Sequence, residues 1–516
     1  MDAPLRTSIY SLMLVVATGM MVARVANVEL LFEPSVHTPK PDPDKPGEFL
    51  PARKWPEKVP TPWPTYSSND RARWATVKAL VEEGTFAIGR RVAEPDPVKK
   101  TPYRDEGIAF TDGFGSVDKV LHPERQEYFS TKPPLLTVIV AGEYWVLRKF
   151  FQKDMVEHKW EVVVPILLLT NVLPLVLALW MISRLLERYA ISDWGRLFTF
   201  AAACFGTFLP TFVTTLNNHV PAACCVVYAV YALATWATAG NRVRSDARMR
   251  EWYPHTGDDS SPEEDNFGSP VRLLLVGLFA GLAVCFELPA LAFAAAIGLV
   301  VLLESKKGFL FFLVAFAIPL AAYAAINQKA VGTVVPVQLK FGTEWYEYEG
   351  SHWARPKLWE SGQVPKPDYP GIDFANEPKQ TYAFHLLVGH HGLFSLTPVW
   401  LLAIGGVFLG PVARGVAGWI ARLTPLVAAG VIGFYIWKTN NYGGWTCGPR
   451  WLFWLTPLLL LTAAPAADAL GKTGVGRGVG YLLLAASAFS ATYPWANPWR
   501  HPWIYQLCEY MDWVRY

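Results

Sequence analysis

Long apolar blocks alternate with polar loops along most of the chain. The apolar blocks lie near residues 8–30, 161–183, 197–216, 220–238, 271–287, 288–304, 308–326, 393–411, 423–437, 451–468 and 479–492. Blocks of about 17–25 apolar residues with few charges are typical of helices that cross a membrane. The pattern therefore predicts an all-α integral membrane protein, built as a multi-spanning bundle of about 11–13 transmembrane helices.

Three long polar stretches interrupt the apolar pattern, at residues 31–132, 239–270 and 327–392. The first is large enough to carry interfacial helices of its own. The charged 239–270 stretch is typical of a solvated linker. We expect an N-terminal transmembrane module over residues 1–326 with a catalytic loop at 31–132. A second external loop at 327–392 and a C-terminal group of helices at 393–516 follow it.

Lysine and arginine predict the orientation of the bundle, because loops on the cytoplasmic side carry an excess of both. The short basic segments are at Arg6, Arg184 to Arg196, Arg242 to Arg272, Lys306 and Lys307, Arg414 and Arg422, and Lys472 and Arg477. All of them fall on one side if the apolar stretch 133–147 is an interfacial or re-entrant helix. A full crossing by 133–147 is the alternative, but it places the basic 239–270 loop outside. Both alternatives leave the 31–132 loop on the extracytoplasmic side.

Composition supports this class and excludes others. The chain of 516 residues is 52% hydrophobic and 17% charged, whereas soluble domains carry about 25% charged residues. A net charge of +3 is too small to suggest a nucleic-acid partner. The sequence contains no Walker loop, Rossmann glycine pattern or HExxH motif, which argues against nucleotide hydrolysis, dinucleotide chemistry and zinc proteolysis. Cys447 and Cys508 fall in external segments and either pair or stay free.

Asp70 is the first residue that could carry chemistry. Apolar side chains recur at helical spacing over residues 70–90, so Asp70 lies near the start of an amphipathic helix, which Ser67 or Ser68 can cap. Such a helix lies in the membrane surface, at the level of lipid headgroups. An aspartate there is either a helix cap or a general base for an acceptor hydroxyl.

Two basic residues stand where a lipid phosphate could bind. Lys132 precedes Pro133-Pro134 and an apolar segment, and Arg450 follows a glycine-containing loop and precedes an apolar helix. Each is either an interfacial anchor or a phosphate ligand that offsets the charge of a departing group. The guanidinium of Arg450 suits bidentate phosphate contacts.

Four further polar residues are site candidates. Asn218 and His219 separate two apolar blocks, and Glu287 interrupts a long apolar stretch. Glu287 lies either at the tip of a helical hairpin or, at a cost of about 2.5–3.5 kcal/mol, inside the bilayer. His391 follows His390, but neighbouring histidines point in different directions in regular structure. A divalent metal therefore stays an open question.

These residues, in this order, resemble the multi-spanning GT-C glycosyltransferases, in particular glycosyltransferase family 39 with the protein O-mannosyltransferases and the lipid A aminoarabinose transferase. Family members show Asp-Glu-x-Arg-Tyr-Ala where this chain has Asp70-Arg71-Ala72-Arg73-Trp74-Ala75. Their Phe-Glu-Lys-Pro-Pro-Leu resembles Phe129-Ser130-Thr131-Lys132-Pro133-Pro134-Leu135. Family members also have a break in a hydrophobic hairpin, which resembles Glu287-Leu288-Pro289 here. Their Arg-Tyr-x-x-Pro motif before a helix is similar to Arg450-Trp451 followed by Pro457.

The resemblance implies a membrane transferase that moves a sugar from polyprenyl phosphate to an acceptor hydroxyl, with inversion. It also implies an active site on the extracytoplasmic side of the membrane. In a bacterium this is the inner membrane. It implies Asp70 as the general base, and Lys132, Arg450 and Arg73 as donor-phosphate ligands. The acceptor is a protein, a lipid or a glycan, and membrane lipids surround the enzyme. Arg71 and Thr131 replace acids of the family motifs, which puts metal dependence in doubt.

Two other function classes remain open from the sequence. A transporter or flippase would place ionisable residues at the midplane and show related halves. Only Glu287 fits the midplane, and no matching halves are evident. A non-catalytic membrane scaffold would instead use its external loops to bind partners.

Overall fold

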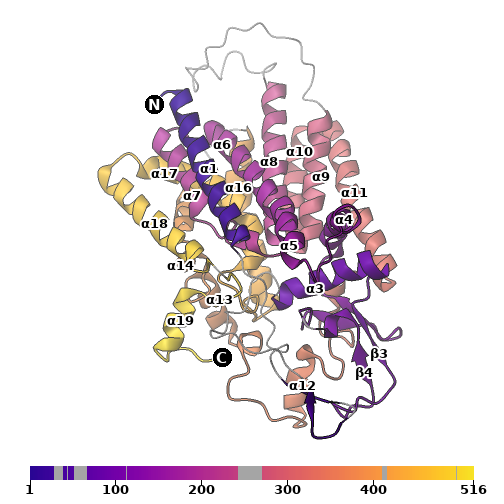
Figure 1. The fold of residues 1–516 in the computed structure, drawn as a ribbon. Coiled ribbons are helices and arrows are strands. Elements are labelled where there is room, and N and C mark those ends of the chain that lie inside the picture. The colour runs from indigo at the N-terminus through magenta and orange to yellow at the C-terminus, as the bar shows by residue number, and fades with distance from the viewer. Residues whose placement is uncertain are drawn as a thin grey trace.

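The structure is a computed structural model that describes residues 1–27, 39–42, 45–50, 67–111, 113–241, 270–409, 415–495 and 497–516. A bundle of helices forms the upper part, and shorter elements gather below it (Figure 1). Most of the predicted 239–270 linker lies outside the described residues.

The bundle helices follow the apolar blocks of the sequence, as predicted. They are α1 (Ala3–Ala26), α5 (Lys159–Leu167), α6 (Leu173–Tyr189), α7 (Asp193–Phe205), α8 (His219–Asn241), α9 (Pro270–Phe286), α10 (Leu291–Glu304), α11 (Lys306–Val331), α15 (Leu401–Leu409), α16 (Gly415–Lys438), α17 (Thr456–Leu470) and α18 (Gly474–Thr492). Among the described residues, 5 helical segments are long and apolar enough to cross a membrane, and shorter apolar helices lie beside them. The prediction of a helical integral membrane protein is therefore confirmed.

Small residues allow the closest helix contacts. At Gly277 of α9, an added Cβ atom would lie 2.1 Å from the carbonyl oxygen of Phe312 in α11. At Gly281, one turn later, it would lie 2.6 Å from the carbonyl oxygen of Phe316. Stripes of small residues let membrane helices pack with their backbones close together, and here they hold α9 against α11.

The elements below the bundle come mainly from the polar stretches. The helices are α3 (Ser68–Lys78), α4 (Pro134–Phe151), α12 (Arg355–Glu360), α13 (Lys379–Leu387), α14 (Leu393–Leu396) and α19 (Trp503–Tyr510). A four-stranded antiparallel sheet has the order β4 (Arg104–Glu106), β3 (Gly89–Val92), β6 (Glu127–Ser130) and β5 (Lys119–Leu121). A short pair joins β1 (Lys40–Pro41) to β2 (Phe49–Leu50).

The sheet and the end of α3 differ from the sequence prediction. Strands of three or four residues are too short to show a clear alternation of apolar and polar positions. The helix predicted over 70–90 ends earlier, since a π-helical turn at Ala79–Glu83 is followed by Gly84 at φ 69°. Protein encloses most of α3, whose residues from Asn69 to Val77 are buried except for Arg71, so it does not lie open on the membrane surface.

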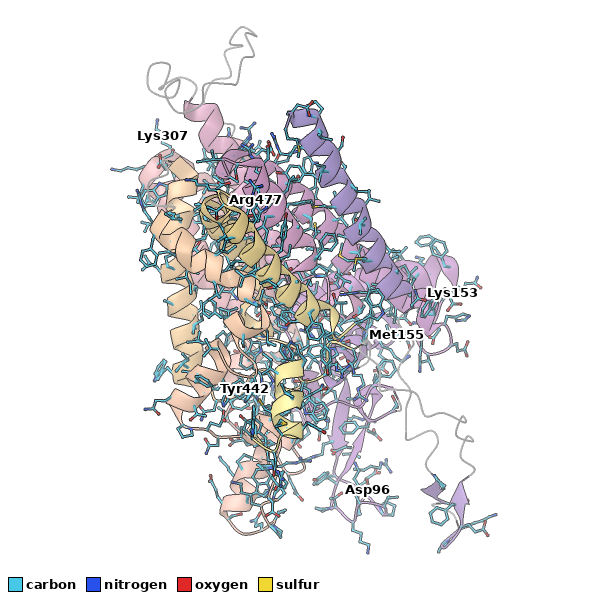
Figure 2. All side chains as sticks on the ribbon, turned by 90° about the vertical axis from the view of Figure 1, so that its left-hand side faces the viewer. Asp96, Lys153, Met155, Lys307, Tyr442 and Arg477 are labelled. Carbon is cyan, nitrogen blue, oxygen red and sulfur yellow. The ribbon has the colours of Figure 1, made fainter. Side chains whose placement is uncertain are left out.

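The course of α4 agrees with the predicted interfacial helix. Figure 1 shows α4 almost end-on, whereas the long bundle helices run roughly from top to bottom. Lys307 and Arg477 lie at the upper end of the molecule, and Tyr442 and Asp96 lie at the lower end (Figure 2). The predicted basic side and the predicted external loops thus occupy opposite ends.

The close approach of α9 and α11 gives a stability prediction. We expect Gly277→Ala to lower the stability of the folded protein by about 1–3 kcal/mol, because its methyl group overpacks the contact with α11. Gly430→Ala is the matched control, since no atom lies within 4 Å of a Cβ added there. The midpoint of thermal unfolding in detergent measures both effects. Equal midpoints for the two variants would contradict the close packing.

Candidate active site

Asp70 lies in the first turn of α3 and is completely buried. The Ser67 hydroxyl accepts the backbone N–H of Asp70 at 3.4 Å, so Ser67 is the helix cap. Neither carboxylate oxygen of Asp70 has a hydrogen-bond partner among the described residues. Burial raises the pKa of Asp70 well above its usual value, whereas Arg73, the Trp499 indole and Arg450 lower it in part. Buried polar groups without hydrogen-bond partners are rare in native proteins, and a catalytic role is one explanation for them.

Arg73 lies one turn after Asp70 and connects it to a polar network. Its guanidinium donates to the backbone carbonyl of Asn69 at 3.2 Å and to the side-chain oxygen of Asn218. The amide of Asn218 donates to Glu287 Oε1 at 2.6 Å. Asn218 and Glu287 lie at the ends of α8 and α9. Charged and polar side chains therefore fix α3 against the bundle.

Glu287 is at the tip of the hairpin between α9 and α10, as the first alternative from the sequence predicted. A 3₁₀ turn at Leu288–Ala290 separates the two helices. The Glu287 carboxylate contacts His219 Nδ1 at the start of α8. His219 Nε2 lies 3.3 Å from Arg450 Nη1, so one chain of contacts joins Arg73 to Arg450.

The loop before Arg450 fixes that side chain. Gly443 and Gly444 both have positive φ, at 96° and 70°, which favours glycine. The Gly443 carbonyl accepts Arg450 Nε at 2.9 Å. The guanidinium lies 5.0 Å from the ring centre of Trp499, a distance typical of a cation–π contact. Arg450 is therefore held at several points and is not a free interfacial anchor.

Lys132 is mostly buried, with 14% of its side chain exposed, and is paired with an acid that the sequence analysis missed. Lys132 Nζ donates to Asp118 Oδ1 at 2.7 Å. Strands β5 and β6 place the two groups together, because Lys119 pairs with Ser130 and Thr131 N–H donates to the Asp118 carbonyl at 3.1 Å. Burial lowers the pKa of Lys132 to about 8 although Asp118 raises it. The pKa of Asp118 is lowered because Lys132, Arg450 and Arg73 outweigh the effect of burial.

A small cavity of about 30 Å³ lies beside Lys132, with room for about one water molecule. Thr76, Phe129, Asn327 and Gln338 are among the residues that line it. Gln338, in the 327–392 loop, donates to the Thr131 carbonyl at 2.6 Å. This loop therefore closes the space next to Lys132.

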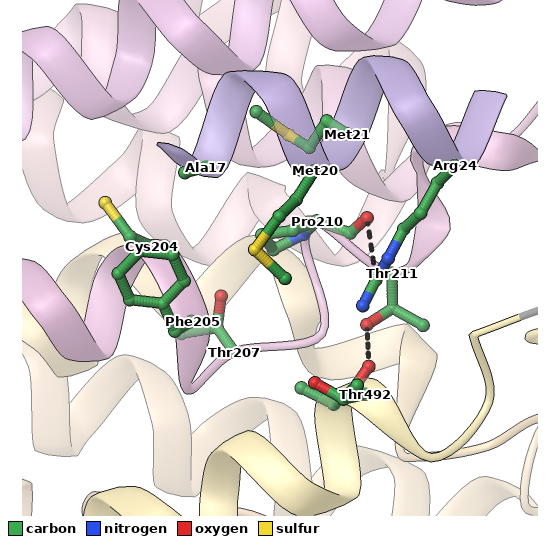
Figure 3. A pocket seen from close by; sticks show the side chains of 11 residues that line it. Ala17, Met20, Met21, Arg24, Cys204, Phe205, Thr207, Pro210, Thr211 and Thr492 are labelled. Atoms are coloured by element: carbon green, nitrogen blue, oxygen red, sulfur yellow. Dashed lines mark hydrogen bonds between the residues drawn. The ribbon is translucent and has the colours of Figure 1, made fainter. Parts of the chain in front are cut away.

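Arg24, near the end of α1, is buried inside the protein and is not an exposed interfacial arginine. It is buried at the lower end of α1 beside a second cavity of about 30 Å³ (Figure 3). Its Nη1 atom donates to the Pro210 carbonyl at 3.2 Å, and its guanidinium lies 4.5 Å from the Trp495 ring centre. Arg24 thus fixes the segment that leads toward Asn218.

The structure places His391 in a different cluster from the other predicted site residues. Its ring stacks on Tyr442 with centroids 4.8 Å apart, and its Nδ1 atom lies 2.5 Å from His390 Nδ1. The other predicted site residues lie together and are linked by contacts or by electrostatic interactions. They are Asp70, Arg73, Lys132, Asn218, His219, Glu287 and Arg450.

Three residues of the site were not found from the sequence. Asp118 and Trp499 come from segments without a recognised motif, and Asn69 precedes the Asp70-Arg71-Ala72-Arg73-Trp74-Ala75 motif without being part of it. A buried lysine needs a counter-charge, so the requirement for an acid near Lys132 was predictable, but its position depends on the β5–β6 pairing.

The acids of the network near Asp70 are engaged by other side chains: Asp118 is paired with Lys132, and Glu287 with Asn218 and His219. Within the described ranges, donor atoms of three His, Cys, Asp or Glu residues converge at Glu377, His385 and His390.

All six cysteines are free, including Cys447 and Cys508. The possible disulfide between the two is therefore not formed.

The comparisons with known proteins find solved structures only. No protein-family model and no curated protein sequence matches the chain. The apo oligosaccharyltransferase of Archaeoglobus fulgidus is similar at 14% identity and a TM-score of 0.43, over 94% of this chain and 55% of that one. Apo ArnT from Cupriavidus metallidurans is similar at 11% identity and a TM-score of 0.45, over 92% of this chain and 62% of that one.

The chain spans between 55% and 62% of the length of these two structures. The likeness concerns the course of the chain.

The Lys132–Asp118 ion pair gives a second stability prediction. Removing one partner of a buried pair leaves an uncompensated charge, at a cost of about 3–5 kcal/mol. We expect Asp118→Asn and Lys132→Met each to lower the thermal midpoint, and the double variant to lose less than the sum of the two. Glu48→Gln is the control, because its pair with Lys45 is exposed and exposed pairs contribute little. Additive losses in the double variant would show that the pair does not couple.

Proposed function

We propose that this protein is a membrane glycosyltransferase that moves a sugar from a polyprenyl-phosphate donor to an acceptor hydroxyl. Asp70 is the general base. The observation that carries the proposal is the buried Asp70 carboxylate, which has no hydrogen-bond partner among the described residues and lies near Arg73 and Arg450. A base needs a free oxygen to accept a proton from its substrate.

The cations of the site suit a phosphate group. Lys132, Arg450 and Arg73 all act electrostatically on the carboxylate of Asp118, and the two arginines also interact with Glu287. Three cations that lie this close together can donate hydrogen bonds to one lipid phosphate. The positive groups would then stabilise the charge that develops on the leaving phosphate.

The reaction is a single displacement. The acceptor O–H gives its proton to Asp70 while its oxygen forms a bond to the anomeric carbon of the sugar. The bond between that carbon and the phosphate oxygen breaks, and the electron pair leaves with polyprenyl phosphate. One displacement inverts the configuration at the anomeric carbon, so no covalent sugar–enzyme intermediate is needed.

The 327–392 loop is the proposed cover of the site and the platform for the acceptor. A cavity of about 30 Å³ beside Lys132 is too small for a sugar phosphate. Donor entry therefore requires that the segment around Gln338 moves away from Thr131. Loop motions of this kind exclude water once the substrate is bound.

Glu287 belongs to the same polar network as Arg73, together with Asn218 and His219. A transporter would combine a midplane site with two related halves of the chain, and no matching halves are evident in the sequence. We place the active site on the extracytoplasmic side, since the basic residues Lys307 and Arg477 lie at the opposite end (Figure 2).

Replacing Asp70 tests the proposed base. We expect Asp70→Asn to lower kcat by about 10²–10⁴-fold, because an amide cannot accept the acceptor proton. Asp96→Asn is the control, since Asp96 is in the same loop but is only partly buried, and an asparagine oxygen can still accept the Val98 N–H. Release of polyprenyl phosphate from a panel of lipid-phosphate sugars measures turnover, and thermal midpoints check the fold. A folded Asp70→Asn protein with control activity would refute the role of Asp70.

The pKa shifts predict a bell-shaped pH profile. Asp70 must be ionised, so kcat/KM rises with pH through its raised pKa. Lys132 must keep its proton to bind phosphate, so kcat/KM falls as pH exceeds about 8. Lys132→Arg retains its charge at high pH, and we expect its alkaline limb to disappear. Profiles from about pH 5 to about pH 10 measure this, and an unchanged alkaline limb in Lys132→Arg would contradict phosphate binding by Lys132.

A further inference from the structure

Histidines gather at a second place, away from Asp70. The chain contains 10 histidines, and four of them, His385, His390, His391 and His501, form consecutive ring contacts. The rings of His385 and His390 stack with centroids 3.9 Å apart, and those of His390 and His391 are 4.7 Å apart. His501 lies 6.0 Å from His391. Such clustering in a chain with so few histidines points to a shared role.

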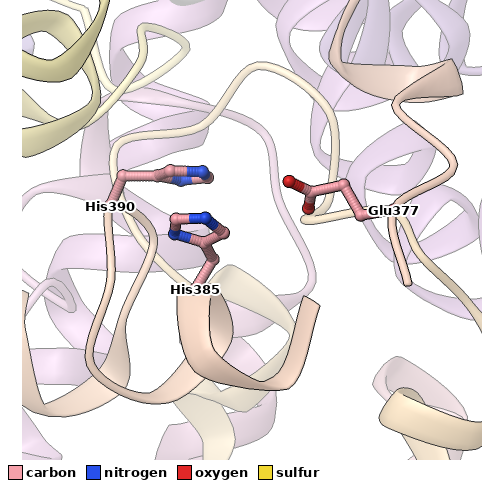
Figure 4. Close-up of side chains that lie close together, drawn as sticks. All are labelled: Glu377, His385 and His390. Carbon is pink, nitrogen blue, oxygen red and sulfur yellow. The ribbon is translucent and has the colours of Figure 1, made fainter. Parts of the chain in front are cut away.

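A carboxylate completes the cluster. Glu377 faces His385 and His390 from the segment before α13 (Figure 4). One donor atom from each of these three residues can be chosen so that all lie within 4.8 Å of one another. Ligands about 2.1 Å from a tetrahedral zinc ion are about 3.4 Å apart, so small side-chain rotations bring the three atoms to bonding distance.

The hydrogen bonds of the cluster leave its donor atoms incompletely used. His385 Nδ1, His391 Nε2 and His501 Nδ1 have no hydrogen-bond partner within the described ranges, and His391 is completely buried. Buried polar atoms without partners are uncommon in native proteins. Of these three atoms, His385 Nδ1 belongs to the proposed set of ligands, and a neutral imidazole nitrogen is a suitable metal ligand.

The carboxylate of Glu377 is bound by neutral groups. It accepts hydroxyl groups from Tyr442 and Tyr516, and no ion pair to it is seen in the described parts of the chain.

We propose that Glu377, His385 and His390 bind a divalent transition-metal ion of the zinc type. Imidazole and carboxylate ligands suit Zn²⁺ better than Mg²⁺ or Ca²⁺, which prefer oxygen alone. The Tyr516 hydroxyl bridges the two ends of this set, at 2.6 Å from Glu377 Oε1 and 2.8 Å from His390 Nε2. The metal takes the position between these ligands, and the hydroxyl moves aside.

The ion would cross-link the second external loop, to which Glu377, His385 and His390 all belong. Glu377 also accepts the Tyr442 hydroxyl, and Tyr442 precedes Gly443, whose carbonyl fixes Arg450. The role is therefore structural: the ion stabilises the loop that holds Arg450. The site does not depend on the proposed transferase activity, and its test needs no substrate.

Metal analysis of full-length protein, purified in detergent without a histidine tag, tests the proposal. Chelator-treated wild type is incubated with Zn²⁺, freed of excess ion and analysed by mass spectrometry. We expect about one ion per chain, as for a structural zinc site, and near-zero content in His385→Ala and His390→Ala. His352→Ala is the control, because His352 is in the same loop but contacts Asp373, and we expect it to keep its ion.

Cobalt keeps the test decisive if a variant fails to fold. Co²⁺ added to chelator-treated wild type should give the visible absorption bands of a tetrahedral site, and Zn²⁺ should remove them. Zinc should also raise the thermal midpoint of wild type. Wild type that binds neither ion, or a His390→Ala protein that keeps its zinc, would overturn the proposal and leave the cluster as a hydrogen-bonded anchor of the C-terminal segment.

Discussion

The burial of charge at the lower end of the bundle is the constraint on which the candidate site depends. Asp70 and Arg73 are both removed from solvent on one short helix, and a buried charge is tolerated only where other groups compensate it. Arg73 is held by Asn218, Asn218 by Glu287, and Glu287 by His219. Since these residues come from α3, the start of α8 and the end of α9, the polar contacts and the packing of the bundle stabilise the same arrangement.

The interruptions of the apolar helices have a common location. Lys132 precedes α4, His219 begins α8 and Arg450 begins the 3₁₀ turn before α17. A helix end leaves backbone groups available and can be approached by other loops, whereas the middle of a membrane helix is covered by its neighbours. The site is therefore assembled from helix ends, and the long helices can remain apolar for the membrane.

The sequence predicted the parts of this arrangement that have a strong local signal. Apolar blocks located the helices, Ser67 was a predicted cap of the Asp70 helix, and the Glu287-Leu288-Pro289 break predicted the hairpin. The sequence did not predict the four-stranded sheet, because its strands are too short to show a period. Asp118 and Glu377 were missed for a related reason: their partners are brought to them by tertiary contacts that local patterns do not encode. His391 was predicted as a site residue, but its neighbours His385 and His501 become visible only in the folded chain.

The most direct test of the account is whether the purified wild-type protein turns over a polyprenyl-phosphate sugar. Donors with different sugars would be incubated with a hydroxyl acceptor, and free polyprenyl phosphate and the glycoside product would be measured together by mass spectrometry. The account predicts that both appear in equal amounts and that the new glycosidic bond has the opposite anomeric configuration to the donor. Donor that binds but is recovered intact with every acceptor would contradict a transferase and favour a protein that binds or moves lipid-linked sugars.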